Sequence, residues 1–258
     1  MRQVSKKSLF VSEIYSAIQG EGPLLGIRQI FLRLSGCDLR CKWCDTPESL
    51  QRSPLCSVEQ KMGERNFKMI QNPINYESFI SFVNNLVPKL HHSMSITGGE
   101  PLLQAELLKT YIIKLKEQFK FPVYLESGGH RHDELSSIIH LLDYVSMDIK
   151  IPSSGTAVLW ENHKKFLDVC LKSESLIDFW IKLVVSEETL LDELVYAVDL
   201  VKSRLINKSP ILFLQPVTQI NGIKPPTPCN LLNIHKELLS LYPHIRVVPQ
   251  VHSLISQK

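Results

Sequence analysis

The chain has 258 residues, of which 44% are hydrophobic and 21% charged, as is usual for a globular protein. Its 29 basic and 26 acidic residues are interspersed and leave a net charge of +3, so the sequence shows no basic patch for nucleic acid. No segment reads as a secretion signal or a membrane span. We therefore expect a cytoplasmic protein whose six cysteines stay reduced, as metal ligands or free thiols.

Strand and helix patterns alternate along the chain. Short β-rich segments occupy residues 9–14, 28–34, 93–97, 122–127, 143–149, 179–185, 211–215 and 245–251. Apolar residues at helical spacing occupy segments 79–87, 107–115, 191–201 and 230–241. This alternation predicts an α/β fold in which helices cover a parallel sheet. About six core strands are too few for a complete barrel, so we predict a partial TIM-type barrel or an open doubly wound sheet.

We expect one domain over residues 1–258. The stretch 46–75 interrupts the alternation, because it is rich in polar and turn-forming residues and has no sustained period. It is also long for a connection between two elements. We predict an irregular insertion here, with room for a short helix.

Three cysteines stand close together in the loop after the strand 28–34. Cys37, Cys41 and Cys44 have the spacing C-x3-C-x2-C, and three thiolates on one loop suit an iron–sulfur cluster or zinc. A cubane cluster takes four ligands, so three cysteines leave one iron open to a small molecule. The alternatives are a zinc site completed by a remote histidine and three buried cysteines without a metal. The position after an early barrel strand, where active sites lie, favours the cluster.

A second motif, Thr97-Gly98-Gly99-Glu100-Pro101, ends the strand 93–97. Glycines allow the backbone to approach a ligand closely, and a carboxylate pairs with an ammonium group. Alone, this segment is more typical of an ordinary turn that caps the next helix. Beside the cysteine loop it indicates a cofactor site.

Together the two motifs resemble the radical S-adenosylmethionine superfamily. Further segments resemble the 7-carboxy-7-deazaguanine synthases of the queuosine pathway: 18–22 (IQGEG), 31–37 (FLRLSGC), 44–46 (CDT), 126–129 (ESGG), 148–150 (DIK), 152–155 (PSSG), 214–216 (LQP) and 250–252 (QVH). The resemblance implies a lyase that converts 6-carboxy-5,6,7,8-tetrahydropterin to 7-carboxy-7-deazaguanine with loss of ammonia. It also implies a [4Fe-4S] cluster, S-adenosylmethionine and Mg²⁺ as cofactors, an electron donor such as a flavodoxin, and a homodimer.

The resemblance also assigns roles to residues, and it implies a radical generated at the cluster and not by a catalytic side chain. The cluster ligands would be Cys37, Cys41 and Cys44. The cofactor contacts would be Trp43, Cys44, Asp45, Gly99, Glu100, Ser127, Asp148, Lys150 and Gln215. The substrate contacts would be Ile18, Gln19, Gly20, Glu21, Arg33 and Thr97.

Two of these assignments have a plain alternative. Thr46 matches the Mg²⁺ position of the family, but before Pro47 it is also typical of a helix cap or turn. Arg33 stands inside an apolar strand, where a buried guanidinium needs a partner such as the substrate carboxylate. On an edge strand the same residue would face solvent.

The remaining candidates are interpreted as structural. They are Cys56, Cys170 and Cys229, together with His91, His92, His130 and His132, which we expect to be solvated loop histidines. Two rival functions stay open. Another radical S-adenosylmethionine enzyme, such as a glycyl-radical activase, would share the cysteine loop but would not need Gln19 to Glu21, Arg33 or Thr46. A non-catalytic zinc- or cluster-binding scaffold would need only the cysteines.

Overall fold

The computed structural model describes residues 8–205 and 207–257. In these ranges ten strands form one sheet in the order β10-β9-β8-β7-β6-β5-β2-β1-β3-β4. The strands are β1 (Val11–Ile18), β2 (Arg28–Leu34), β3 (Leu55–Glu59), β4 (Phe67–Gln71), β5 (Ser93–Gly98), β6 (Val123–Ser127), β7 (Tyr144–Asp148), β8 (Asp178–Val185), β9 (Leu212–Pro216) and β10 (Ile245–Val247). β2 and β5 to β10 are parallel to their neighbours in this series, and β1 runs antiparallel to β2.

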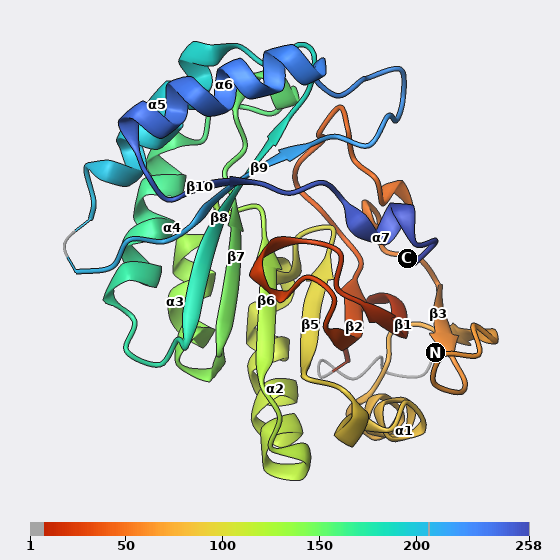
Figure 1. The fold of residues 1–258 in the computed structure, drawn as a ribbon. Helices are drawn as coiled ribbons and strands as arrows, with labels where there is room; N and C mark the ends of the chain where they lie inside the picture. Colours follow the sequence, from red (N-terminus) through yellow and green to blue (C-terminus); the bar gives the residue numbers. More distant parts are fainter. Residues whose placement is uncertain (1–7, 206, 258) are drawn as a thin grey trace.

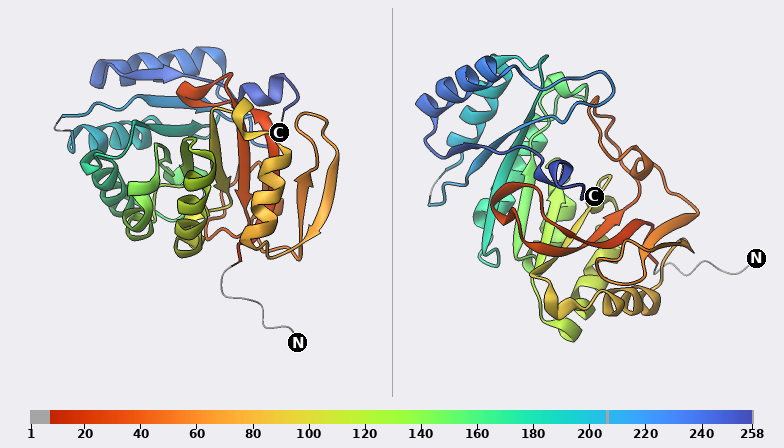
Figure 2. Two further views of the ribbon diagram at one scale, coloured as in Figure 1. Left: turned by 90° about the horizontal axis from the view of Figure 1, so that it is seen from below. Right: turned by 45° about the vertical axis from the view of Figure 1, so that its right-hand side comes forward.

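Helices follow most of the parallel strands. They are α1 (Tyr76–Asn85), α2 (Ala105–Phe119), α3 (His132–Ile138), α4 (Trp160–Lys172), α5 (Leu191–Lys202), α6 (Pro228–Leu241) and α7 (Val251–Leu254). Short 3-10 turns are η1 (Gly22–Leu24), η2 (Pro47–Ser49), η3 (Pro88–Leu90), η4 (Pro101–Gln104), η5 (Ile139–Leu141) and η6 (Pro152–Ser154). Helices α2 to α6 lie along the outer face of the curved sheet (Figures 1 and 2). None of the helices in the described ranges has the length and hydropathy needed to span a bilayer.

The core between sheet and helices follows from the sequence pattern. In β9, residues 212–215 are all buried, as expected of a strand covered on both faces. In α2, Leu108, Ile112 and Leu115 recur on one face and are buried. The side chain of Asn75 accepts a hydrogen bond from the Ser78 amide and so caps α1. Burial of these faces confirms the prediction of a sheet covered by helices.

The structure differs from the predicted elements at several places. β1 continues to Ile18, although the prediction ended at Ile14. The predicted strand 245–251 is wrong after Val247, because residues 248–250 leave the sheet and α7 begins at Val251. The prediction also did not include α3 and α4.

The stretch 46–75 was predicted to be irregular, and this is wrong for much of its length. It contains the hairpin of β3 and β4, and β3 adds to the sheet beside β1. Its short helix exists as η2. The hairpin has a weak pattern because β4 is exposed, with Met69 57% accessible. Pairing with β1 stabilises it where local propensity does not.

Candidate active site

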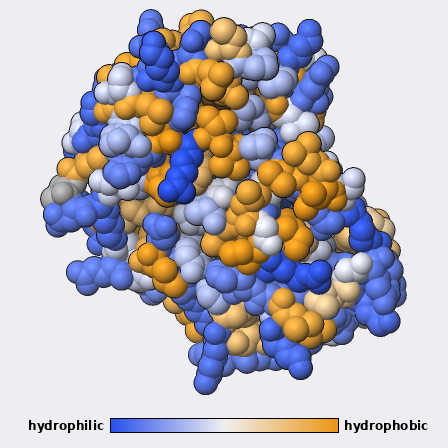
Figure 3. All heavy atoms as spheres, viewed as in Figure 1, coloured by the Kyte–Doolittle hydropathy of each residue, from blue (hydrophilic) through white to orange (hydrophobic). Residues whose placement is uncertain are grey.

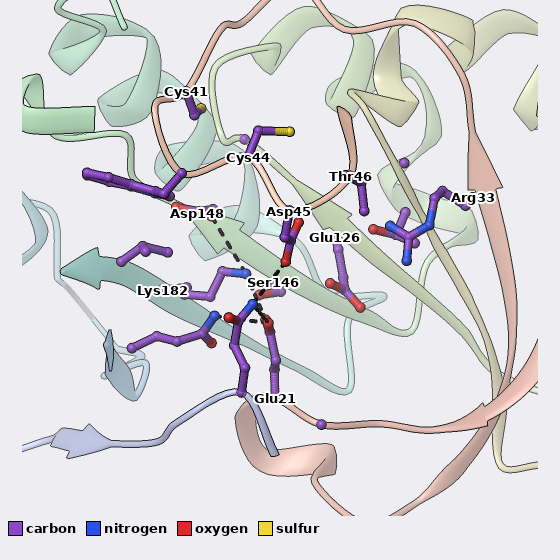
Figure 4. Close-up of a pocket in the computed structure, with 18 of the residues that line it drawn as sticks. Glu21, Arg33, Cys41, Cys44, Asp45, Thr46, Glu126, Ser146, Asp148 and Lys182 are labelled. Atoms are coloured by element: carbon purple, nitrogen blue, oxygen red, sulfur yellow. Dashed lines mark hydrogen bonds and ion pairs between the residues drawn. The ribbon is translucent and has the colours of Figure 1, made fainter. Parts of the chain in front are cut away.

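One cavity of about 460 Å³ opens where the carboxyl ends of the parallel strands meet. Every residue that the sequence predicted for the site lines it: Ile18, Gln19, Gly20, Glu21, Arg33, Cys37, Cys41, Trp43, Cys44, Asp45, Thr46, Thr97, Gly99, Glu100, Ser127, Asp148, Lys150 and Gln215. Figure 4 shows Cys41 and Cys44 at one end of this cavity and Glu21 with Lys182 at the other. The two ends therefore have different chemistry, which we describe in turn.

The cysteine loop is held against the Gly-Gly-Glu turn by backbone contacts. The Glu100 amide donates to the Gly36 carbonyl at 2.9 Å, and the Gly99 amide donates to the Leu34 carbonyl at 3.1 Å. A Cβ on Gly99 would lie 2.5 Å from the Gly36 oxygen and 2.8 Å from the Cys37 Cβ. Only glycine fits at that position, so the turn packs directly on the loop.

The three thiols of the loop fit an iron–sulfur cluster. All three are free, and burial raises the pKa of Cys37 to about 11, so its thiol keeps its proton until a metal replaces it. In the described ranges no three metal-ligating side chains are preassembled, so the thiols must rotate to converge. Among those same residues no further cysteine lines the cavity. The donor set thus supplies three ligands and leaves one position for a small molecule.

Glu100 is a buried carboxylate beside this loop, with 1% of its surface exposed. It accepts hydrogen bonds from the Ser127 hydroxyl at 3.0 Å, the Gly128 amide at 2.9 Å and the Leu102 amide at 3.1 Å. Burial raises its pKa despite these donors. A cation in the cavity would stabilise its charged form, so the site suits an ammonium group.

His91 and His130 were predicted to be solvated loop residues, and this prediction is wrong for both. Both are only 7% exposed. The Nε2 of His130 lies 3.1 Å from both carboxylate oxygens of Asp38, which stands between the first two cysteines. A carboxylate only accepts, so this nitrogen carries a hydrogen. His130 therefore ties the cysteine loop to the loop after β6, with its Nδ1 3.9 Å from Glu100.

Charged side chains form a network at the other end of the cavity. The Lys182 ammonium lies 2.8 Å from Glu21 Oε2 and 3.6 Å from Asp148 Oδ2, and the Lys150 ammonium lies 2.7 Å from Asp148. Burial opposes ionisation of Glu21, but the ammonium of Lys182 outweighs it and lowers the pKa of Glu21 to about 2. Glu21 is therefore ionised at neutral pH.

Two candidate side chains that line this end of the cavity, Lys182 and Glu126, were not predicted from the sequence. Lys182 is the one charged residue in the apolar segment FWIKLVV, the same signal that drew attention to Arg33. Glu126 belongs to the ESGG segment, but the family resemblance assigned it no contact with cofactor or substrate. Its Oε1 accepts from Gln19 at 3.1 Å and from the Ser95 hydroxyl at 3.1 Å. Burial, with the charge of Glu21 nearby, raises the pKa of Glu126.

The surroundings of Arg33 and Thr46 do not support the alternative roles of a solvent-facing edge residue and a helix cap. β2 lies between β1 and β5, so Arg33 does not stand on an edge strand, and its side chain is only 13% exposed. It lies 3.3 Å from Glu13 and donates to the Tyr15 hydroxyl at 2.9 Å. Thr46 precedes η2, but its side chain makes no capping hydrogen bond. Its side chain is thus not engaged as a helix cap.

The model of the 4Fe-4S single cluster domain matches residues 18–156, which include the cysteine loop, Glu100 and Asp148. The partial barrel, the three-cysteine loop and the Gly-Gly-Glu turn define a radical S-adenosylmethionine enzyme with a [4Fe-4S] cluster. The 7-carboxy-7-deazaguanine synthase of Geobacter sulfurreducens is 38% identical over 98% of this chain and 100% of the relative. That of Methanopyrus kandleri is 32% identical over 96% and 93%. The chain belongs to the 7-carboxy-7-deazaguanine synthase family.

Solved structures agree in fold. QueE from Escherichia coli superposes with a TM-score of 0.61 over 94% of each chain at 17% identity. A radical SAM methyltransferase from Sphaerobacter thermophilus gives 0.56 over 92% of this chain and 77% of the other, at 8% identity. At such identities the likeness concerns the fold alone. It agrees with the predicted partial barrel.

Proposed function

We propose that the protein converts 6-carboxy-5,6,7,8-tetrahydropterin to 7-carboxy-7-deazaguanine with loss of ammonia, as a carbon–nitrogen lyase of 7-deazapurine and queuosine biosynthesis. One observation carries this proposal. A single cavity joins a three-thiol end to a polar end with the carboxylates of Glu21 and Glu126 and the guanidinium of Arg33. The curated relatives, named for this synthase activity, support it.

At the cysteine end, Cys37, Cys41 and Cys44 would hold the cluster. The carboxylate of Glu100 would bind the ammonium group of S-adenosylmethionine. Asp148 offers a second polar atom, because its Oδ1 is buried and has no hydrogen-bond partner within the described residues. The other proposed contacts with S-adenosylmethionine are Trp43, Asp45, Gly99, Ser127, Lys150 and Gln215. When bound, cluster and cofactor supply the radical that removes a hydrogen atom from the substrate.

At the polar end, the substrate is a pterin with amino and ring N–H donors and a carboxylate. Carboxylate oxygens accept from such donors, and a guanidinium suits a carboxylate. Glu21 is ionised and Arg33 is a buried cation, so the two can bind opposite ends of the substrate. The remaining contacts would be Ile18, Gln19, Gly20 and Thr97.

Thr46 is the proposed protein ligand of Mg²⁺. Its side chain lines the cavity and makes no capping hydrogen bond with η2. Mg²⁺ keeps most of its waters and needs few protein oxygens. A single hydroxyl beside the substrate therefore suffices, and the metal would help orient the substrate carboxylate.

The wider setting is also proposed. We infer one domain over residues 1–258, because buried residues from β1 to α6 belong to one hydrophobic cluster. We further propose a cytoplasmic homodimer reduced by a one-electron donor such as a flavodoxin, without nucleic-acid or membrane partners. The activase and scaffold alternatives are not favoured by the family to which the chain belongs.

A product assay under strict anaerobiosis tests the function. The reconstituted enzyme receives S-adenosylmethionine, reductant, Mg²⁺ and the tetrahydropterin, and the products are identified by mass spectrometry. We expect 7-carboxy-7-deazaguanine together with methionine and 5′-deoxyadenosine. Formation of 5′-deoxyadenosine without the deazapurine would refute the substrate, and formation of neither by cluster-loaded enzyme would refute the enzymatic proposal.

A further inference from the structure

The C-terminal segment returns across the open side of the barrel. β10 lies at one edge of the sheet, yet the chain after it crosses to the loop that follows β1, where α7 lies (Figures 1 and 2). We call residues 248–257 the C-terminal strap. The Val251 amide donates to the Gly20 carbonyl at 3.0 Å, and a Cβ on Gly20 would lie 2.4 Å from the His252 amide nitrogen. The strap therefore packs directly on the predicted substrate loop.

Val248, at the start of the strap, packs against the buried cluster of Leu24, Tyr124, Trp180 and Phe213, but the last apolar side chains of the strap are exposed. Leu254 is 76% exposed and Ile255 is 48% exposed. Figure 3 shows hydrophobic side chains on the surface over α7. The strap is joined to residues that line the cavity mainly by hydrogen bonds, and the side chain of Gln250 makes most of these.

The Gln250 amide joins three separate segments. Its Nε2 donates to Glu21 Oε1 at 3.1 Å and to Asp45 Oδ2 at 3.0 Å. Its Oε1 accepts from the Thr218 amide at 3.3 Å and from the Thr218 hydroxyl at 2.7 Å. The backbone donor of Thr218 identifies the amide oxygen, so the two hydrogens of Nε2 face the two carboxylates. Figure 4 shows dashed interaction lines that reach the carboxylates of Glu21 and Asp45.

The side-chain amide of Gln250 lies between two carboxylates, those of Glu21 and Asp45. The carboxylates of Glu21 and Asp45 approach the same nitrogen, and without a donor between them like charges would separate. Glu21 is also held by Lys182 and by Gln215, which donates at 2.9 Å. Gln250 adds the direct link to the cysteine loop, which carries Asp45.

We propose that Gln250 is a positioning residue. Its side-chain amide fixes the carboxylate of Glu21, which binds the substrate, relative to the carboxylate of Asp45, which follows the last cysteine of the loop. The C-terminal strap thereby completes the substrate end of the cavity from the opposite edge of the sheet. This inference rests on the proposed function, because Glu21 is a substrate contact only there. A strap that merely stabilised the fold would not depend on this particular side chain.

The test compares Gln250→Ala and Gln250→Glu with Arg65→Ala. Arg65 donates to the Ser256 carbonyl at 2.8 Å, so its loss loosens the strap without touching Glu21. Binding of 6-carboxypterin, the fluorescent oxidised analogue, is titrated on cluster-loaded enzyme with S-adenosylmethionine and no reductant. We expect roughly tenfold weaker binding for Gln250→Ala, as for loss of a hydrogen bond to a charged group. Gln250→Glu should weaken it further by repulsion, and Arg65→Ala should bind like the wild type.

A double-mutant cycle separates positioning from general stability. In a Glu21→Gln background, Gln250→Ala should have little further effect, because coupled residues are not additive. Hydrogen exchange of residues 18–22 gives a second reading without the pterin, and Gln250→Ala should accelerate it while Arg65→Ala does not. Wild-type affinity and exchange in Gln250→Ala, equal losses in Arg65→Ala, or full additivity would each overturn the inference. If the wild type does not bind 6-carboxypterin, the product assay decides the substrate, and the exchange comparison alone decides the role of Gln250.

Discussion

Replacement of Lys182 by methionine tests the buried charge network most directly. Methionine keeps much of the apolar stem and removes the ammonium that lies 2.8 Å from Glu21, in a pair whose side chains are only 16% and 12% exposed. Breaking a buried pair costs about 3–5 kcal/mol, because it leaves an uncompensated charge. Lys150 still pairs with Asp148 at 2.7 Å, so we expect the lower end, a loss of about 3 kcal/mol in the free energy of unfolding at pH 8.

The pH dependence of this loss follows from the pKa of Glu21. In the wild type that pKa falls from 4.5 to about 2, so the stabilisation is complete above pH 4.5 and disappears as the pH falls toward 2. Without Lys182, burial raises the pKa of Glu21 above its ordinary value. The loss in free energy of unfolding caused by Lys182→Met therefore becomes smaller as the pH falls from 8 to 5, by at most about 1.4 kcal/mol per pH unit.

The assay is chemical denaturation of the full chain under anaerobic conditions, followed by circular dichroism between pH 5 and 8. Lys42→Met is the matched control, because Lys42 lies the same 2.8 Å from Glu188 but the two side chains are 47% and 45% exposed. An exposed pair contributes less than about 1 kcal/mol. A Lys182→Met loss as small as this control, or one that does not change with pH, would refute the reasoning.

Three further predictions concern other parts of the site. Cys37→Ser should lower the iron content after reconstitution to a small fraction of the wild-type value. Cys229 is an exposed cysteine outside the cavity, so Cys229→Ser should leave the iron content unchanged. Equal iron content in the two variants would contradict the assignment of Cys37 as a ligand. Thr46→Ala should raise the Mg²⁺ concentration needed for half-maximal product formation by roughly tenfold, the size of one lost ligand interaction, with 5′-deoxyadenosine formation less affected; an unchanged Mg²⁺ titration would exclude Thr46 as a ligand. Gly20→Ala should destabilise the chain by about 1–3 kcal/mol, because the new methyl group would meet the His252 backbone at 2.4 Å, and a wild-type melting temperature would show that the strap is not packed there.

Local features of the site were predictable from the sequence alone. Cys37, Cys41 and Cys44 lie within one short loop, so their spacing already places them at one end of the site. The glycines of the Gly-Gly-Glu turn were informative for the same reason, since the need for close backbone approach is a property of one position. Arg33 was identified because a charge inside an apolar strand needs a partner. The sequence did not name Glu13 and Tyr15 as its partners, although both lie beside it.

The sequence by itself therefore predicted the mostly parallel sheet and the three clustered thiols, because these depend on short-range spacing and periodicity, and its resemblance to a known family indicated the class of chemistry. Only the tertiary structure decided the long-range partners: Lys182 with Glu21, His130 with Asp38, and Gln250 with Asp45 are separated by 161, 92 and 205 residues. The hairpin of β3 and β4 likewise depends on pairing with β1. Such contacts form because strand order brings distant segments to one end of the sheet, and no local pattern of residues records which side chains will meet there.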